Sequence, residues 1–351
     1  MDSVYAGTYG KLKALAQDLL QRDVFDELDR KGKDEFIPAL SNTSYKDEIS
    51  SFYSQYKLPE LVEVVLNSHM MRNIQNAVKL LPTGSRPVVE AYIGKWDLDN
   101  IRLILYSKIR NFDVSGADSF LVVDRTMPVS TYSGFITKEE YANLIAQRSL
   151  EDVIEAASKY WYGTKLMEAI NSIKSIADVD KALLRLEIAY YENLLDKFRF
   201  YNGDEGPLYR FFKELIDIRN ITTAIRFRQN HVEGNLDLAK GGNLQNEAIN
   251  AILTSPPSEW KAKIVYKVDT AVKMYEESKL LSFLGTGMLG DLYGRYLPVF
   301  RSNALSLDYL FYFIIRSEIE RKELMAIWFK NYNNIPEDKA KLIRMTSYVN
   351  I

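Results

Sequence analysis

The sequence predicts an all-α protein that is built from three related helical units. Helix-breaking residues are rare: the 351 residues include 17 Gly and 10 Pro, about 5% and about 3%, against roughly 7% and 5% in average proteins. Apolar residues recur every three or four positions over long segments, which is the spacing of one helix face. A short polar motif also occurs three times at similar intervals, as in repeat architectures.

The first clear helix start along the chain is Thr137–Glu140. Its sequence is a capping box, in which the threonine and the glutamate three residues later bind each other's backbone amides. The preceding stretch, residues 112–137, has an irregular pattern, and only Phe120–Val123 is typical of a short strand.

Two long helices are expected between residues 178 and 229. Asp178 is a suitable N-cap for the first helix. Pro207 suits the first position of the second helix, because proline lacks the amide hydrogen that a helix start leaves unpaired. The apolar stripe of the first helix is Val179, Leu183, Leu186, Tyr190 and Leu194, and that of the second is Leu208, Phe211, Leu215, Ile218, Thr222 and Ile225.

The repeated motif has the form acid-x-x-(Asn or Glu)-aliphatic. Its copies lie 120 and 103 residues apart, close to one third of the chain. We therefore predict helical repeats over residues 1–125, 126–238 and 239–351. The polar residues of the three copies are Asp97 and Asn100, Asp217 and Asn220, and Glu320 and Glu323.

A second motif marks the unit junctions, as Gly134-Phe135-Ile136-x-x-Glu139 and Gly242-Asn243-Leu244-x-x-Glu247. Within the first motif, the polar residues are three positions apart and therefore share one helix face. Their neighbours are apolar, so one interpretation is a structural latch that is buried and hydrogen-bonded between helices. In the other interpretation, the three acids line a central channel and hold a partner.

Composition excludes several classes of function. The net charge is −2 and the pI is about 5.9, so the chain has no general attraction for nucleic acid. The longest uncharged stretch, Thr126–Thr137, has 12 residues, whereas a membrane-spanning helix needs about 20. No signal peptide is recognisable at the N-terminus. We therefore expect a cytoplasmic protein without a membrane-spanning segment.

No catalytic, cofactor-binding or metal-ligating residues are predicted. The chain has no cysteine, and His69 and His231 are its only histidines, too few for a multi-histidine metal site. Gly285–Gly290 matches the dinucleotide pattern Gly-x-Gly-x-x-Gly, and Asp308 follows it. That pattern requires a preceding strand within a βαβ unit. In a helical chain we instead expect a turn or a close helix contact.

With this set of motifs, the chain resembles the family of C subunits of archaeal and bacterial A/V-type ATP synthases, which is similar to the d subunits of vacuolar ATPases. The likeness includes Tyr209 and Lys213 ahead of Asp217, and Tyr312 and Arg316 ahead of Glu320, at the same spacings. The chain departs from the family pattern at two positions. Glu323 stands where the family usually has Asn, and Tyr106 where it often has Arg.

The resemblance implies three repeats around a pseudo-threefold axis, forming a funnel with a central cavity. It implies a non-catalytic rotor protein on the cytoplasmic face of the membrane proteolipid ring, with the tip of the central shaft, made of the D and F subunits, in the cavity. Attachment to the membrane would then depend on protein partners alone. An unrelated helical scaffold that binds other proteins is the main alternative, and an all-helical enzyme is a more distant one.

Overall fold

Helices make up most of the computed structural model, which describes residues 6–111, 123–124, 127–128, 138–160, 167–168, 175–202, 206–231, 236–260, 262, 264 and 269–349. The longer helices are α5 (Glu60–Lys79), α7 (Lys95–Arg110), α11 (Ile176–Asn202), α12 (Pro207–Gln229), α16 (Leu281–Ser302) and α17 (Leu307–Asn333). The shorter helices of the first half are α1 (Ala6–Leu15), α2 (Arg22–Asp29), α3 (Lys33–Leu40), α4 (Lys46–Phe52), α6 (Arg86–Ile93), α8 (Lys138–Ala146) and α9 (Leu150–Ala157). Those of the second half are α13 (Asn246–Thr254), α14 (Pro257–Trp260), α15 (Asp269–Ser278) and α18 (Glu337–Ala340). Short 3-10 turns are η1 (Ala16–Asp18), η2 (Thr83–Ser85) and η5 (Met345–Ser347).

Both long helices expected between residues 178 and 229 are present, as α11 and α12. Pro207 is the first residue of α12 and follows Gly206 in extended conformation, as predicted. The N-cap prediction for α11 was wrong. This helix begins at Ile176, and the Oγ of Ser175 accepts a hydrogen bond from the Asp178 amide at 3.3 Å. Asp178 therefore lies in the first turn, where its charge is favourable beside the positive end of the helix dipole.

The predicted strand and the predicted capping box lie only partly within the described residues. β1 (Val123–Asp124) pairs antiparallel with β2 (Met127–Pro128), with Val123 opposite Pro128. Residues 120–122 of the expected strand are outside the described part. The helix expected after residue 137 is α8, whereas its expected cap, Thr137, is also outside it.

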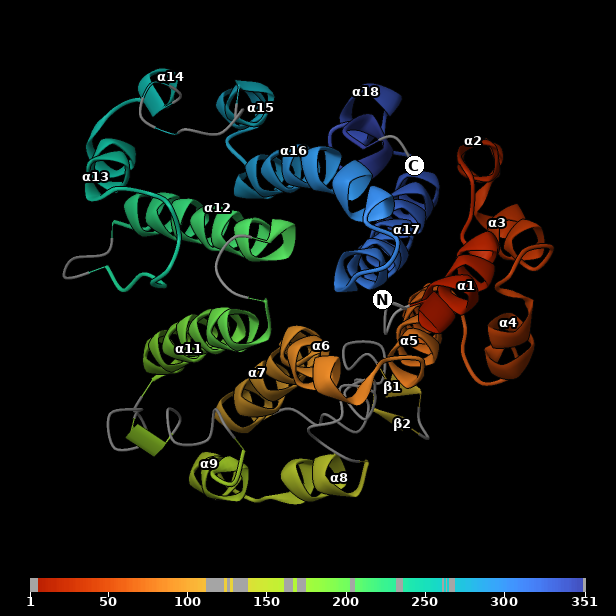
Figure 1. Cartoon of the computed structure of the whole chain (residues 1–351), viewed down its shortest axis with the longest axis horizontal. Coiled ribbons are helices and arrows are strands. Elements are labelled where there is room, and N and C mark those ends of the chain that lie inside the picture. Colours follow the sequence, from red (N-terminus) through yellow and green to blue (C-terminus); the bar gives the residue numbers. More distant parts are fainter. Residues whose placement is uncertain are drawn as a thin grey trace.

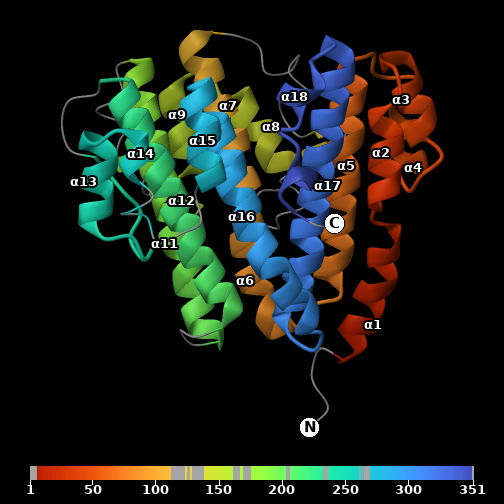
Figure 2. The same ribbon diagram turned by 90° about the horizontal axis from the view of Figure 1, so that it is seen from above.

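The long helices surround a common centre (Figure 1). Going around it, α5 packs on α17, α17 on α16, α16 on α12, α12 on α11, and α11 on both α6 and α7. The short η2 segment connects α5 to α6. The C-terminal helix α17 therefore lies against N-terminal helices, and Figure 2 shows that the long helices run along a similar direction. None of the described helices combines the length and the hydropathy that are needed to cross a bilayer.

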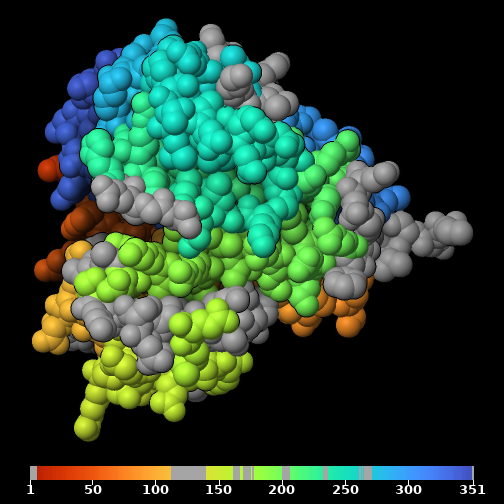
Figure 3. All heavy atoms as spheres, turned by 90° about the vertical axis from the view of Figure 1, so that its left-hand side faces the viewer, coloured from red at the N-terminus to blue at the C-terminus, as the bar shows by residue number. Residues whose placement is uncertain are grey.

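Short helices cover the outside of this arrangement. α13 packs on α12, α15 packs on α16, and α2 and α3 pack on α17. The outer face in Figure 3 shows the cyan residues of α13 and α14 over the green residues of α12. The inner sides of the long helices are therefore the surfaces that meet at the centre.

Aromatic side chains fill the centre at one end of the helices. The rings of Tyr92 on α6, Phe198 on α11 and Phe311 on α17 all lie within 5.5 Å of the ring of Phe212 on α12, centroid to centroid. All four residues are at most 2% exposed. This aromatic cluster, Tyr92, Phe198, Phe212 and Phe311, joins helices from distant parts of the chain, and the centre is closed at this level.

Candidate functional site

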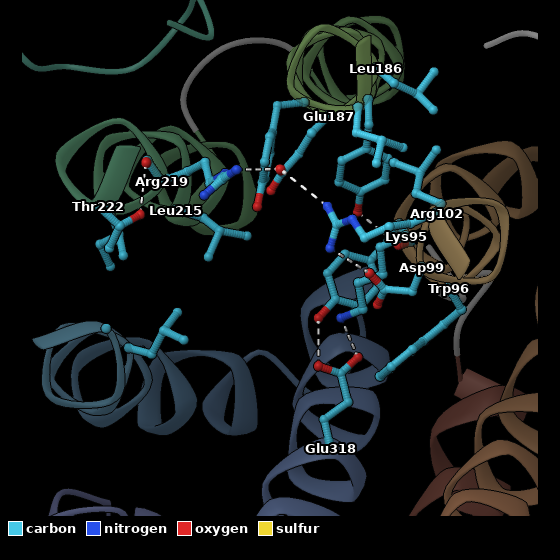
Figure 4. A pocket seen from close by; sticks show the side chains of 18 of the residues that line it. Lys95, Trp96, Asp99, Arg102, Leu186, Glu187, Leu215, Arg219, Thr222 and Glu318 are labelled. Atoms are coloured by element: carbon cyan, nitrogen blue, oxygen red, sulfur yellow. Dashed lines mark hydrogen bonds and ion pairs between the residues drawn. The ribbon is translucent and has the colours of Figure 1, made fainter. Parts of the chain in front are cut away.

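A cavity of about 420 Å³ lies at the centre, between helices that are far apart in sequence (Figure 4). α7, α11, α12, α16 and α17 all contribute to its wall, together with Tyr92 of the aromatic cluster. Its apolar lining includes Trp96, Leu98, Leu183, Leu186, Leu215, Ile218 and Leu289. Its charged lining consists of Lys95, Asp99, Arg102, Glu187, Arg219, Glu318, Arg321 and Lys322.

The three copies of the repeated motif place equivalent positions on the cavity wall. In each copy, the residue two before the acid and the residues one and two after it line the cavity. These residues are Lys95, Leu98 and Asp99 on α7, Leu215, Ile218 and Arg219 on α12, and Glu318, Arg321 and Lys322 on α17. The repeat therefore presents the same helix face to the centre three times.

Ion pairs cross the cavity wall between helices that are far apart in sequence. Lys95 Nζ lies 2.6 Å from Glu318 Oε1, so α7 is joined to α17. Glu187 on α11 pairs with Arg219 on α12, and the guanidinium of Arg102 on α7 lies 3.7 Å from the same carboxylate. Figure 4 shows these pairs around the cavity. The wall thus combines apolar side chains with a network of ion pairs between helices.

Burial shifts the pKa of two ionisable groups in this wall, Asp99 and Tyr92. It raises the pKa of the Asp99 carboxyl, an effect that the nearby Arg102 and Lys95 charges oppose. It also raises the pKa of Tyr92 well above its ordinary value, and the neighbouring Glu318 carboxylate adds to this rise. Tyr92 therefore stays a neutral donor, and its hydroxyl donates to Glu318 at 3.1 Å.

The six motif residues themselves lie behind the cavity wall. None of them lines the cavity, and all are at most 6% exposed. The interpretation in which the three acids line a central channel is therefore wrong. Within the first copy, the hydroxyl of Tyr141 on α8 donates to Asp97 Oδ1 at 3.1 Å.

The second copy holds the segment that connects α12 to α13. The backbone amides of Asn243 and Leu244 donate to Asp217 Oδ1 at 2.8 and 3.0 Å. The side chain of Asn220 both donates to the carbonyl of Ala239 and accepts from its amide. At Gly242, any Cβ would overlap the Asp217 carboxylate. The junction motif and the acid motif of the sequence are thus direct contact partners.

The third copy contacts both ends of the chain. Glu320 accepts hydrogen bonds from the Leu20 amide at 2.7 Å and the Tyr45 hydroxyl at 2.8 Å. Leu20 precedes α2 by two residues, as Leu244 precedes α13. Glu323 accepts from Arg344 Nε and from the Thr346 amide and hydroxyl near the C-terminus.

Glu323 replaces the asparagine of the other copies with an acceptor-only group. The side-chain amide of Asn220 can both donate to the backbone carbonyl of Ala239 and accept from its backbone amide, because an amide group carries a donor and an acceptor. A carboxylate needs donors alone, and Arg344 and Thr346 supply them. The departure from the motif at this position is therefore matched by a change in its partners.

Asp217→Ala is expected to lower the free energy of unfolding by about 1–3 kcal/mol, because it leaves the partly buried amides of Asn243 and Leu244 without this acceptor. Denaturant unfolding followed by circular dichroism measures the change. Asp237→Ala is the matched control, since Asp237 is half-exposed and pairs loosely with Arg185 at 3.6 Å. If Asp217→Ala has the same free energy of unfolding as the wild type, the interpretation of the motif as a structural latch is refuted.

The glycine pattern at Gly285–Gly290 lies inside α16, without a preceding strand. A Cβ at Gly287 would lie 2.8 Å from the Cβ of Ala271 on α15, and one at Gly290 would overlap Tyr348. The expected close helix contact is confirmed. The histidines differ in setting: His69 is buried and stacks on Tyr45 at 3.7 Å between ring centroids, whereas His231 is exposed in the turn after α12.

The charged residues of the cavity were not among the predicted site residues, although the sequence contains a signal for most of them. They flank the motif acids at fixed offsets, as Lys95, Asp99, Arg219, Glu318 and Lys322 do. An i, i+3 pair defines one helix face, whereas the neighbours of the acid lie on the adjacent face. Which of these two faces is turned toward the centre was decided by the packing of the long helices on one another.

Comparison with known proteins gives the family. The ATP synthase (C/AC39) subunit family matches residues 8–342. The C subunit of the A-type ATP synthase of Thermoplasma acidophilum is 30% identical over 356 residues, which cover 99% of both chains. That of Thermoplasma volcanium is 30% identical over 96% of this chain and 97% of its own length. The same protein of Methanococcoides burtonii is 24% identical over 74% of this chain and 70% of its own. With a central cavity enclosed by repeated helices and full-length relatives of this kind, the chain belongs to the ATP synthase (C/AC39) subunit family.

Proposed function

We propose that this chain is a non-catalytic central-stalk component of an A-type ATP synthase, coupling the rotating shaft to the membrane proteolipid ring in ATP-linked proton or sodium transport. The observation that carries the proposal is the cavity, whose wall combines α7, α11, α12, α16 and α17. A tip seated there would transmit torque to these five helices at once. Relatives that match along nearly the whole chain are named as the C subunit of this enzyme.

The size of the cavity suits the end of a helix. One turn of an α-helix, about 10–12 Å wide with side chains and 5.4 Å long, occupies roughly 400–600 Å³. The cavity of about 420 Å³ is of the same order as one such turn. We therefore propose that it receives the tip of the shaft formed by the D and F subunits.

The arrangement of helices supports three units over residues 1–125, 126–238 and 239–351, related by a pseudo-threefold axis in a funnel. In each unit, the helix with the motif acid packs on the first long helix of the next: α7 on α11, α12 on α16, and α17 on α5. The latch role proposed for the six motif residues follows the same order. Asp217 holds the start of α13, and Glu320 holds the start of α2. The third unit would thereby close on the first.

The proposed location is the cytoplasmic face of the cell membrane, where the protein would be attached through its protein partners. The chain would join the ring and the shaft without a lipid-embedded segment of its own, and without contact to nucleic acid. The alternative of an unrelated helical scaffold is excluded by membership in the family.

Co-purification from a membrane extract tests the proposal. An affinity-tagged copy of this chain, expressed with the other proteins of its ATP synthase, is expected to retain both the proteolipid ring and the D and F subunits. Native mass spectrometry of the assembled complex should show one copy of the chain per ring. Recovery without ring or shaft proteins, or several copies per ring, would overturn the proposed role.

A further inference from the structure

The two cations that α17 adds to the cavity wall are adjacent in sequence. Lys322 stands where α7 carries Asp99 and α12 carries Arg219, so only Arg321 differs in charge from both equivalent residues. Arg321 directly follows the motif acid, where α7 and α12 carry the apolar residues Leu98 and Ile218. Lys322 follows it. In this copy of the motif alone, two adjacent positive side chains line the cavity.

Neither of these two cations forms an ion pair within the described part of the chain, although the Glu63 and Glu318 carboxylates raise the pKa of Arg321 and Glu318 raises that of Lys322. No carboxylate there lies within 4.0 Å of either charged group, whereas Lys95, Arg102 and Arg219 are all paired with acids. Arg321 donates to the side-chain oxygen of Asn67, which is uncharged. Lys322 Nζ lies over the ring of Tyr293, 5.9 Å from its centroid.

Desolvation makes these charges costly in the isolated chain. Burial lowers the pKa of Lys322 to about 8, and the Lys95 and Arg321 charges lower it further, while Glu318 opposes them. Burial also lowers the pKa of Arg321. A desolvated cation is stable when an anion pairs with it. The cavity wall, with five cations and three carboxylates, thus has an excess of positive charge.

An apolar cavity adjoins the two cations. It measures about 300 Å³ and shares Leu289, Arg321 and Lys322 with the central one. The rest of its wall is Thr286, Met325, Ala326, Phe329, Ile343 and Met345. Phe329 is 53% exposed, although the three residues before it on α17 are buried. Arg321 and Lys322 therefore lie at the border between the two cavities.

We propose that Arg321 and Lys322 bind an acidic side chain at the tip of the shaft helix that enters the cavity, with apolar residues of that tip in the adjoining cavity. This inference rests on the proposed function and specifies the chemistry of the partner. Bidentate pairing with Arg321 and a point charge on Lys322 are both suited to a carboxylate.

The test measures the affinity of the full chain for the purified complex of the D and F shaft subunits, by titration at low and moderate salt. Lys322→Met and Arg321→Gln are each expected to weaken binding at least tenfold and to reduce its salt dependence. Lys273→Gln is the matched control, because it removes the same charge from a side chain that is 77% exposed on the outer helix α15. It should leave the affinity unchanged.

Three further measurements distinguish loss of charge pairing from misfolding of the variant. The melting midpoint of Lys322→Met should be no lower than that of the wild type, because an unpaired and desolvated charge has been removed. Lys322→Arg should restore most of the affinity. In a double-mutant cycle, replacing at least one shaft-tip Asp or Glu with its amide should weaken wild-type binding but not Lys322→Met binding.

The outcomes distinguish this inference from the proposed function. If the wild-type chain binds the shaft complex and both variants bind equally well, the carboxylate site is wrong while the rotor role stands. If no acidic residue of the tip couples to Lys322, the inference also fails. If the wild-type chain itself does not bind the shaft complex, the proposed function fails.

Discussion

Phe212→Ala is expected to lower the free energy of unfolding by about 3–5 kcal/mol, which is typical for removal of a fully buried aromatic ring. Phe212 has no exposed surface, and its ring contacts those of Tyr92, Phe198 and Phe311. These rings come from three other helices, so the surrounding structure cannot collapse onto the vacated space without moving all of them.

Denaturant unfolding, followed both by circular dichroism and by tryptophan fluorescence, measures this loss. Phe329→Ala is the matched control: it removes the same group from a side chain that is 53% exposed and should change stability by less than about 0.5 kcal/mol. If the two variants lose the same stability, the aromatic cluster does not hold the helices together at this end.

Glu323→Ala is expected to lower the free energy of unfolding by about 3 kcal/mol. Breaking a buried ion pair by removing one partner typically costs about 3–5 kcal/mol. The lower end applies here because Arg344 keeps a second pair, to Asp29 at 2.9 Å. The change also leaves the Thr346 amide and hydroxyl without this acceptor.

Two variants make the Glu323 prediction specific. Glu277→Ala removes a carboxylate from an exposed pair with Lys273 on α15 and should have almost no effect. Glu323→Gln should destabilise less than Glu323→Ala, because one side-chain oxygen can still accept from Thr346. A Glu323→Ala protein as stable as Glu277→Ala would show that the C-terminal segment is held by other contacts.

The buried motif residues and the charged residues of the cavity wall have different roles. Asp217 and Glu323 are buried acceptors whose partners are backbone amides and one arginine of the same chain. Their contacts are satisfied internally, so they stabilise the fold. Lys322 lacks such a partner among the described residues, and a charge that is left unsatisfied by its own chain is available for another.

Local sequence determined the helices, the spacing of the repeat and the absence of a dinucleotide fold around Gly285–Gly290. These features depend on residues within a few turns of each other, so periodicity, caps and glycine context are sufficient to predict them. The N-cap of α11 was misplaced by three residues, because Ser175 and Asp178 are both good caps and their hydrogen bond decides between them.

Only the tertiary structure decided which helix face is turned toward the centre. The motif acids and the cavity residues are neighbours in sequence, yet Asp217 faces the Asn243 and Leu244 amides while Arg219 faces the cavity. Glu320 meets Leu20 across 300 residues. Such pairings arise from long-range packing between helices that are far apart in sequence, and the spacing of residues along a single helix carries no information about it.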